Sequence, residues 1–314
     1  MTTTRRSFFG IAATGIAGAA ASKLGQNSGP QFIVAAVTTL DRAGRFDDGM
    51  NKDYLAMVAE GGADGALALG TTGEFSSFSV KERKQILESF LRHKGKLGVI
   101  CQVTTPNLPE TLDLLAHATA AGADSALVLP PFYYKNPSSD GLAAFYEPIL
   151  KAAKLPVLLY NIPQLSGAPI TAELLRRLSK YDRLYGMKDL FSKTEPMLAF
   201  IHEFTRLKIL TGVTQNVAAN LQGGGAGALT GNGSVFLRET RAIFDAVSKS
   251  GEVQAAQKHL NDAGATLSGY DGIPATKYAL SLMGLRESAV RPPFVELSSE
   301  KKKELAERLK RFRG

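Results

Sequence analysis

The chain has 314 residues, of which 44% are hydrophobic and 21% are charged. These proportions are ordinary for a protein with a full hydrophobic core, and they exclude a chain that is disordered as a whole. The length fits one α/β barrel, because barrels of this kind commonly reach this size as a single domain. The formal net charge is +8, and an excess of positive charge can indicate binding to an acidic partner such as nucleic acid or a membrane surface.

Basic residues gather at both ends of the chain, at Arg5 and Arg6 and in the run from Lys301 to Arg313. Three glutamates interleave with the second group: Glu300, Glu304 and Glu307. This alternation is typical of a solvated helix. No aromatic platform or zinc-ligand spacing accompanies the charge, so we expect no nucleic-acid partner.

The first 25 residues predict a twin-arginine export signal. Arg5 and Arg6 precede a Phe pair and a weakly apolar Ala/Gly-rich run from Ile11 to Ala21, in which Ala19–Ala21 provides a cleavage site. The run is too short and too rich in glycine for a membrane anchor. We therefore expect a linker at residues 26–30 and an exported protein, periplasmic or extracellular, with no stable membrane insertion after cleavage.

From residue 31 onward, short β-rich runs alternate with helical patterns. The predicted strands are Phe32–Val37, Gly65–Leu69, Leu97–Val103, Ser125–Leu129, Val157–Tyr160, Leu184–Met187, Lys208–Leu210 and Ala226–Leu229. The helical stretches between them include Asn51–Glu60, Val80–Lys94, Leu108–Ala121 and Ala172–Ser179. This order predicts an α/β protein, a (β/α)8 TIM barrel over residues 31–250.

A doubly wound open sheet is the competing topology, but it would need a Gly-rich turn after the first strand. That strand is followed by Thr38-Thr39-Leu40-Asp41. Residues 251–314 predict a C-terminal helical extension with helices near Gln254–Thr266, Pro274–Met283 and Ser298–Arg311.

The single cysteine, Cys101, excludes an intrachain disulfide and lies in an apolar run, where it is expected to be a small buried hydrophobe. The four histidines are scattered without metal-ligand spacing, so no metal site is expected.

Polar residues that carry chemistry follow three of the predicted strands: Gly70–Glu74, Tyr160–Pro163 and Gly186–Asp189. Active sites of parallel barrels lie at these carboxyl ends of the strands. Because side chains alternate along a strand, Tyr160 and Lys188 can both point into the barrel from neighbouring strands, and Gly186 would leave space below the lysine.

A lysine in an apolar barrel is costly as a cation, so burial favours a neutral amine that can attack a ketone and form an imine. The phenol of Tyr160 could move a proton to and from the substrate oxygen. Thr71, Thr72 and the backbone N–H groups of their turn can hold a carboxylate. Together these groups suit a 2-oxo acid, although each segment alone also fits a solvated lysine, a plain turn or a strand ended by proline.

The three segments resemble the GTTGE, YNxP and GxKD signatures of the dihydrodipicolinate synthase / N-acetylneuraminate lyase superfamily, the class I Schiff-base pyruvate aldolases. Further resemblance lies in Leu129–Lys135, Gly223–Gly227, Ile273–Ala275 and Arg291–Pro293. The likeness extends from Phe32 to the C-terminus. It implies that Lys188 forms the Schiff base, that Tyr160 transfers protons, and that Thr71 and Thr72 bind the carboxylate, with Thr71 also in the relay.

The resemblance further implies a tyrosine that completes the relay across a dimer interface, either Tyr133 or Tyr134, of which we favour Tyr134. It places Gly73 and Gly212 beside the substrate. It also implies a homotetramer, a dimer of dimers, and no cofactor, since the lysine itself serves as the electron sink.

Three positions depart from the two best-known branches. Leu165 replaces the arginine that receives the second substrate in the synthase branch, Leu190 replaces a threonine of the lyase branch, and Gln215 stands where acidic residues bind sugar hydroxyls. We therefore expect a lyase or aldolase that cleaves or condenses another pyruvate-type 2-oxo acid, with a 2-keto-3-deoxy sugar acid as one candidate. The alternatives are a hydro-lyase, a 4-hydroxy-tetrahydrodipicolinate synthase-like condensation, and a non-catalytic periplasmic oxo-acid binder.

Overall fold

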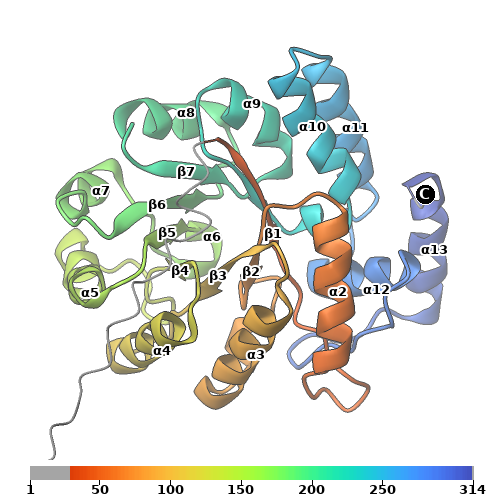
Figure 1. Ribbon diagram of the computed structural model, residues 1–314, viewed down its shortest axis with the longest axis horizontal. Coiled ribbons are helices and arrows are strands. Elements are labelled where there is room, and N and C mark those ends of the chain that lie inside the picture. Colours follow the sequence, from red (N-terminus) through yellow and green to blue (C-terminus); the bar gives the residue numbers. More distant parts are fainter. Residues whose placement is uncertain (1–28, 313–314) are drawn as a thin grey trace, which may run out of the picture.

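A computed structural model describes residues 29–312, and in it eight parallel strands close into a barrel in chain order (Figure 1). The strands are β1 (Gln31–Ala35), β2 (Gly65–Ala68), β3 (Gly98–Gln102), β4 (Ser125–Val128), β5 (Val157–Asn161), β6 (Leu184–Asp189), β7 (Lys208–Thr211) and β8 (Gly227–Thr230). The pairing of β1 with β8 completes the ring. The predicted TIM barrel is confirmed, and the open-sheet alternative is wrong.

Helices surround the barrel (Figure 1). They are α2 (Asp48–Glu60), α3 (Val80–His93), α4 (Leu108–Ala121), α5 (Ser139–Ala152), α6 (Pro163–Ser166), α7 (Ala172–Leu178), α8 (Thr194–Glu203), α9 (Val217–Gln222) and α10 (Leu237–Ser248). Short 3-10 turns η1 (Phe75–Ser77), η2 (Thr214–Asn216) and η3 (Asn232–Ser234) follow β2, β7 and β8. The C-terminal extension contains α11 (Val253–Ala265), α12 (Gly272–Leu282), α13 (Ser299–Leu309) and the 3-10 turn η4 (Lys310–Phe312).

Local sequence signals explain where the barrel helices begin. Ser79 accepts from the backbone N–H of Glu82, whose side chain accepts from the backbone N–H of Ser79, so a capping box opens α3. Asn107 is the N-cap of α4, where its side chain accepts from the backbone N–H of Glu110. Pro109 lies in the first turn of this helix, where a proline is well tolerated. Gly122 ends α4 at φ 87°, a left-handed conformation that glycine adopts without strain.

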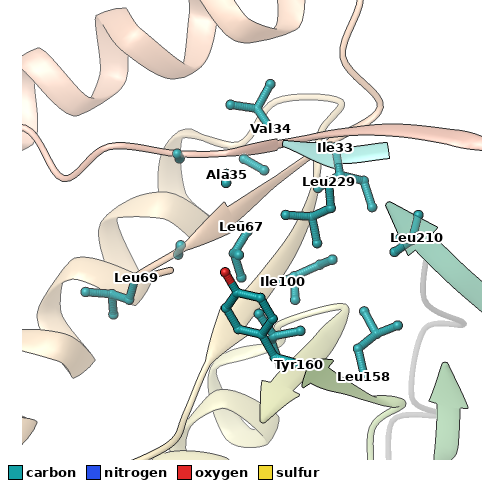
Figure 2. Close-up of a cluster of buried hydrophobic side chains, with 14 of the residues drawn as sticks. Ile33, Val34, Ala35, Leu67, Leu69, Ile100, Leu158, Tyr160, Leu210 and Leu229 are labelled. Carbon is teal, nitrogen blue, oxygen red and sulfur yellow. The ribbon is translucent and has the colours of Figure 1, made fainter. Parts of the chain in front are cut away.

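The amino-terminal half of the barrel is filled by apolar side chains. Four of them, one from each odd-numbered strand, line the same small cavity: Ile33, Ile100, Leu158 and Leu210. Figure 2 shows these residues in one cluster with Tyr160 among them. This is the layered packing of a closed barrel, in which the four side chains of a layer come from alternate strands. The residues of the candidate site lie at the other end of the strands.

Strand β6 is longer than the sequence pattern predicts, and it includes Lys188 and Asp189. In the register with β5, Tyr160 pairs with Lys188 and Leu158 pairs with Gly186. Since paired residues of parallel strands share a face, Lys188 enters the barrel beside Tyr160.

Gly186 is needed for a reason different from the expected space below the lysine. A Cβ at this position would collide with the backbone of Lys208 on β7, beginning with its carbonyl oxygen. Backbone of a neighbouring strand cannot move aside as a side-chain tip can. The glycine therefore permits β6 and β7 to approach each other directly below the residues of the candidate site.

Gly186→Ala is expected to lower the free energy of unfolding by about 1–3 kcal/mol or more, because the added methyl overpacks the strand pair. Urea unfolding measures this change. Gly272→Ala is the control, since a Cβ at the start of α12 meets nothing within 4 Å, and it should alter stability by about 0.5 kcal/mol or less. Equal stability of the two variants would contradict the explanation.

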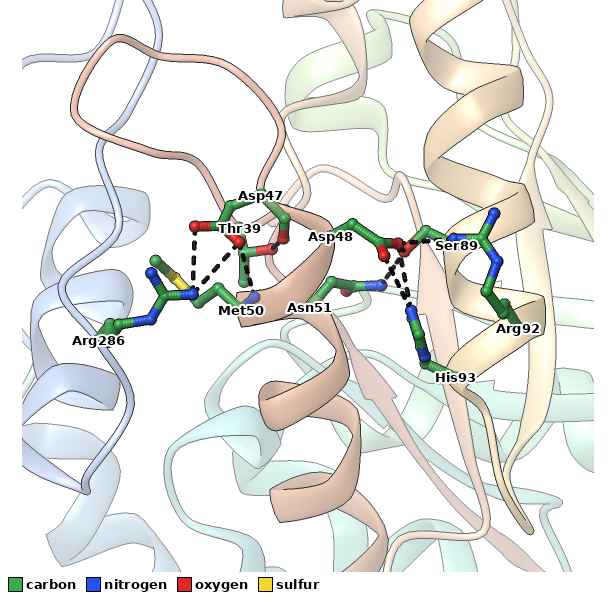
Figure 3. A network of polar contacts seen from close by, with 9 residues as sticks. All are labelled: Thr39, Asp47, Asp48, Met50, Asn51, Ser89, Arg92, His93 and Arg286. Atoms are coloured by element: carbon green, nitrogen blue, oxygen red, sulfur yellow. Dashed lines mark hydrogen bonds and ion pairs between the residues drawn. The ribbon is translucent and has the colours of Figure 1, made fainter.

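The C-terminal segment is attached to the barrel at the amino end of α2 (Figure 3). Asp47 caps this helix by accepting from the backbone N–H of Met50, and Arg286, beyond α12, forms an ion pair with Asp47 at 3.2 Å. On the other side, Asp48 contacts residues of α3: Ser89, Arg92 and His93. The two acidic residues thus join α2 to its neighbour in the barrel and to the C-terminal extension.

The predicted export signal lies outside the described residues, and the predicted linker lies inside them only from residue 29. No helix within residues 29–312 combines the length and the apolar character that a membrane span requires. Cys101 is buried on β3, and burial raises the pKa of its thiol to about 12.

Candidate active site

Lys188 lies inside the barrel at the carboxyl end of β6 and is only 4% exposed. Its Nζ atom donates a hydrogen bond to the Tyr160 hydroxyl at 3.1 Å and lies 4.2 Å from the centre of the Tyr160 ring. Tyr160 is itself buried. The structure therefore brings together the amine and the phenol that the sequence predicts to act together.

A third group, Thr71, joins this pair. Its Oγ1 atom is 3.4 Å from the Tyr160 hydroxyl. Thr71, Thr72 and Gly73 lie in the turn that follows β2, where the backbone N–H of Gly73 donates to the Gly70 carbonyl at 3.0 Å. Amine, phenol and threonine hydroxyl thus form a continuous chain of groups, suited to moving a proton between a bound oxo acid and the enzyme.

Glycines form part of the wall around the lysine. A Cβ at Gly212 would approach Lys188 Cε to 3.0 Å and would overlap the side chain of Leu190. A Cβ at Gly231, after β8, would lie 3.0 Å from Thr72 Oγ1. Gly212 therefore lies directly beside the predicted Schiff-base lysine, and Leu190 adds an apolar surface next to it.

Behind the lysine, Asp189 and Asn161 form a buried pair that the sequence analysis missed. Asn161 Nδ2 donates to Asp189 at 2.8 Å, and the backbone N–H of Phe191 donates to the other carboxylate oxygen at 2.9 Å. Asn161 also accepts from the backbone N–H of Ile170 at 2.9 Å. Because Tyr160 precedes Asn161 and Lys188 precedes Asp189, this pair fixes the two strand ends that carry the reactive groups. The YN and KD dipeptides were the only signal in the sequence.

Burial raises the pKa of Asp189 to about 6, although the hydrogen bonds from Phe191 and Asn161 partly oppose the rise. Between about pH 4 and pH 6 the folded chain holds this proton while the unfolded chain releases it, so ionisation of Asp189 opposes folding. Relative to Asp189→Asn, which cannot titrate, the wild-type free energy of unfolding should fall by about 2–3 kcal/mol as pH rises through this window. Urea unfolding at several pH values measures it; curves that stay parallel would contradict the prediction.

Tyr133 and Tyr134 lie apart from the buried groups and are 74% and 76% exposed. Their loop lies against α6, because Lys135 Nζ donates to the Leu165 carbonyl at 3.0 Å. Leu165 is 57% exposed. The rings of Tyr133 and Tyr134 contact each other edge to face, and neither tyrosine is brought to the buried groups within this chain.

Among residues 29–312, no three or more His, Cys, Asp or Glu side chains gather in a group that could hold a metal ion.

The model of the dihydrodipicolinate synthetase family matches residues 30–312. The chain belongs to this family. It is 38% identical over 278 residues to an uncharacterized DapA-like lyase of Chloroflexus aurantiacus. The aligned region covers 86% of this chain and 93% of that protein. It is 32% identical to a 4-hydroxy-tetrahydrodipicolinate synthase of Hyphomonas neptunium, over 83% of this chain and 90% of the relative.

Solved structures have the same fold. YagE, a prophage protein of E. coli K12 solved in complex with pyruvate, matches with a TM-score of 0.85 at 26% identity, covering 90% of this chain and 98% of YagE. A catalytic lysine mutant of the sialic acid aldolase of Ruminococcus gnavus matches with a TM-score of 0.84 at 24% identity, covering 89% and 94% of the two chains. The chain thus belongs to a family whose members include a DapA-like lyase and 4-hydroxy-tetrahydrodipicolinate synthases, and it shares its fold with a sialic acid aldolase.

Proposed function

We propose that this protein is a lyase or aldolase that forms a Schiff base between Lys188 and a pyruvate-type 2-oxo acid. The observation that carries the proposal is the chain of contacts from Lys188 Nζ through the Tyr160 hydroxyl to Thr71 Oγ1, at 3.1 and 3.4 Å. A buried amine can form an imine with a ketone, and a phenol within hydrogen-bond distance can transfer the protons that this reaction needs.

In the proposed mechanism, Lys188 attacks the C2 ketone of the oxo acid. Tyr160 passes a proton to the substrate oxygen, which leaves as water when the imine forms. In the cleavage direction the Tyr160 phenolate takes the proton of the C4 hydroxyl as the C3–C4 bond breaks, C4 leaves as an aldehyde, and the bonding electrons move through C3 to the imine nitrogen to give an enamine. In the reverse direction C3 of the enamine attacks an aldehyde, and Tyr160 returns the proton to the new C4 oxygen. Thr71 is placed to return the proton to Tyr160.

The turn of Thr71, Thr72 and Gly73 is the proposed site of the substrate carboxylate. Hydroxyls and backbone N–H groups in a tight turn bind anionic oxygens well. Thr72 lies on the side of the turn next to Gly231, across from β8. This arrangement holds the oxo acid by its carboxylate while its ketone faces Lys188.

The second substrate, or the leaving aldehyde, is proposed to differ from that of the named relatives. Leu165 and Leu190 provide no charge for a carboxylate and few partners for sugar hydroxyls, so the synthase-like condensation and sialic acid cleavage are not favoured. The substrates to screen are 2-keto-3-deoxy sugar acids and, beside them, 2-oxo acids with an apolar group beyond C4.

The test is reductive trapping. The purified protein is mixed with pyruvate, treated with borohydride, and its intact mass is measured. We expect a covalent adduct whose peptide map assigns it to Lys188. No adduct with pyruvate or any other small 2-oxo acid would overturn the Schiff-base proposal, whereas an adduct without turnover of any screened acid would favour the non-catalytic binder.

We also propose a homotetramer in which Tyr134 reaches the site of a partner subunit. The support is the solvent exposure of Tyr133, Tyr134 and Leu165, together with the resemblance to the family. Light scattering gives the oligomeric state, and mixing inactive Lys188→Ala with inactive Tyr134→Phe should restore part of the activity if the subunits exchange residues.

The proposed export through the twin-arginine route rests on residues 1–25 and is checked by fractionating cells that produce the full chain.

A further inference from the structure

A buried ion pair lies behind the turn that carries Thr71 and Thr72. Glu74, the last residue of the turn, and Lys277, from α12 in the C-terminal extension, meet at 2.5 Å between Oε1 and Nζ. The two side chains are 0% and 1% exposed. Both charges are therefore removed from water although neither has been given a part in the proposed chemistry.

The other polar atoms of this pair are also satisfied. Lys277 Nζ donates to the Ala289 carbonyl at 2.6 Å, and the second carboxylate oxygen of Glu74 accepts from the backbone N–H of Arg291 at 2.9 Å. The Arg291 guanidinium continues the connection, because it donates to the Ser77 carbonyl at 2.9 Å and pairs with Glu82 at 2.6 Å. The C-terminal extension thus contacts the segment after β2 through a continuous set of ion pairs and hydrogen bonds.

The turn that carries Thr71 and Thr72 has a strained backbone conformation at each of its ends, at Leu69 and at Glu74. Four non-glycine residues have positive φ within the described part of the chain, and two of them, Leu69 at 60° and Glu74 at 54°, border this turn. Residues with side chains adopt this region at an energetic cost and stay there only when their surroundings hold them. Next to Glu74, Gly73 is also held, because Thr38 Oγ1 donates to its carbonyl oxygen at 2.7 Å.

An ion pair of this kind is a weak source of stability. Removing two charges from water costs about as much as their attraction returns, and apolar replacements of such pairs are often neutral or stabilising. What the pair offers is a fixed geometry, since two charges and their hydrogen bonds are satisfied in one arrangement only. Here that arrangement sets the position of Glu74, whose backbone N–H donates to the Thr71 carbonyl at 3.0 Å.

We propose that Glu74 and Lys277 form a positioning pair: anchored to the C-terminal extension, it holds the strained turn so that Thr71 and Thr72 face the substrate carboxylate and the Tyr160 hydroxyl. The proposal rests on the proposed function for its effect on substrate, and on the geometry alone for its effect on the turn.

The test replaces both charges at once. In Glu74→Gln/Lys277→Met no buried charge is left unpaired, and the glutamine can still accept from the Arg291 N–H. We expect a folded protein whose pyruvate concentration for half-maximal borohydride trapping rises about tenfold or more, because small displacements of binding groups have large effects on reactive complexes. Trapping at saturating pyruvate should still occur, since Lys188 and Tyr160 are untouched.

Two controls separate positioning from general stability. Leu305→Ala removes a buried side chain of α13 and weakens the extension without touching the pair. Arg286→Met removes a different ion pair between the extension and the barrel, the one with Asp47. Both should keep the wild-type half-saturation, even where Leu305→Ala lowers the melting temperature as much as the double variant does.

Wild-type half-saturation in the folded double variant would overturn the proposal, and so would an equal rise in Leu305→Ala. If the double variant does not fold, Glu74→Gln alone decides by the same readout. If neither folds, the pair is needed for the fold itself, and the positioning role is rejected.

A readout that needs no substrate distinguishes this inference from the proposed function. Hydrogen exchange of the peptide containing residues 69–78 should be faster in the double variant than in wild type and unchanged in Arg286→Met. Suppose that the wild type captures no oxo acid, but that exchange is faster in the double variant than in the wild type. The Schiff-base proposal then fails, while the role of the pair in positioning the turn stands. If the wild type does capture pyruvate but the double variant exchanges at the wild-type rate, the positioning role is rejected and the Schiff-base proposal stands.

Discussion

Lys188→Ala is expected to abolish covalent capture of pyruvate and all turnover. The reason is that the imine bond needs the ε-amine, and a buried methyl group cannot replace it. The fold should survive the change, because the hydrogen bond that the amine donates to the Tyr160 hydroxyl is the polar contact that the substitution removes. Loss of the adduct in a folded variant would therefore report on chemistry.

The measurement is intact mass after borohydride treatment with pyruvate, together with circular dichroism and a melting curve. Lys208→Ala is the matched control: it removes a lysine from the neighbouring strand, at the opposite end of the barrel. It should give the wild-type adduct. An undiminished adduct in Lys188→Ala would mean that another amine is the nucleophile and would remove the basis of the mechanism.

Tyr160→Phe is expected to slow imine formation by about 10²–10⁴-fold, the usual contribution of a positioned proton-transfer group. The ring and its packing among Leu67, Ile100 and Leu158 remain (Figure 2), so only the hydroxyl between Lys188 and Thr71 is lost. Saturating pyruvate should not restore the rate, because the missing group acts on the reacting atoms and not on the carboxylate.

Rapid-quench trapping measures the rate of adduct formation in this variant. Tyr146→Phe is the control, since Tyr146 is a fully buried tyrosine on α5, away from the site. It should form the adduct at the wild-type rate. A wild-type rate in Tyr160→Phe would show that water or another group carries the proton.

The Lys188 and Tyr160 variants and the variants of the Glu74–Lys277 pair test different parts of the proposed reaction. Lys188 and Tyr160 come from neighbouring strands of the barrel and are proposed to act on the ketone. The turn of Thr71 and Thr72 is held from behind by Lys277, which belongs to the C-terminal extension. Variants of the barrel pair should therefore change rates at saturation, whereas variants of the positioning pair should change the concentration that gives half-saturation.

The sequence by itself determined the barrel and the order of its strands. Apolar runs separated by helical patterns are local features, and a run that is buried on both faces reads as a strand wherever it falls. Side-chain alternation also predicted that Tyr160 and Lys188 share the interior, because a strand has a fixed period of two residues. The resemblance of three short motifs then indicated the family.

Only the tertiary structure decided the contacts between segments far apart in the chain. The partner of Glu74 is Lys277 on α12, and no pattern in either segment indicates the other. Gly186 was expected to leave space below a lysine, but the carbonyl of Lys208 on the next strand fills that space. In each case the outcome depends on how closely backbones and buried charges approach once the barrel has closed, and a linear sequence does not contain those distances.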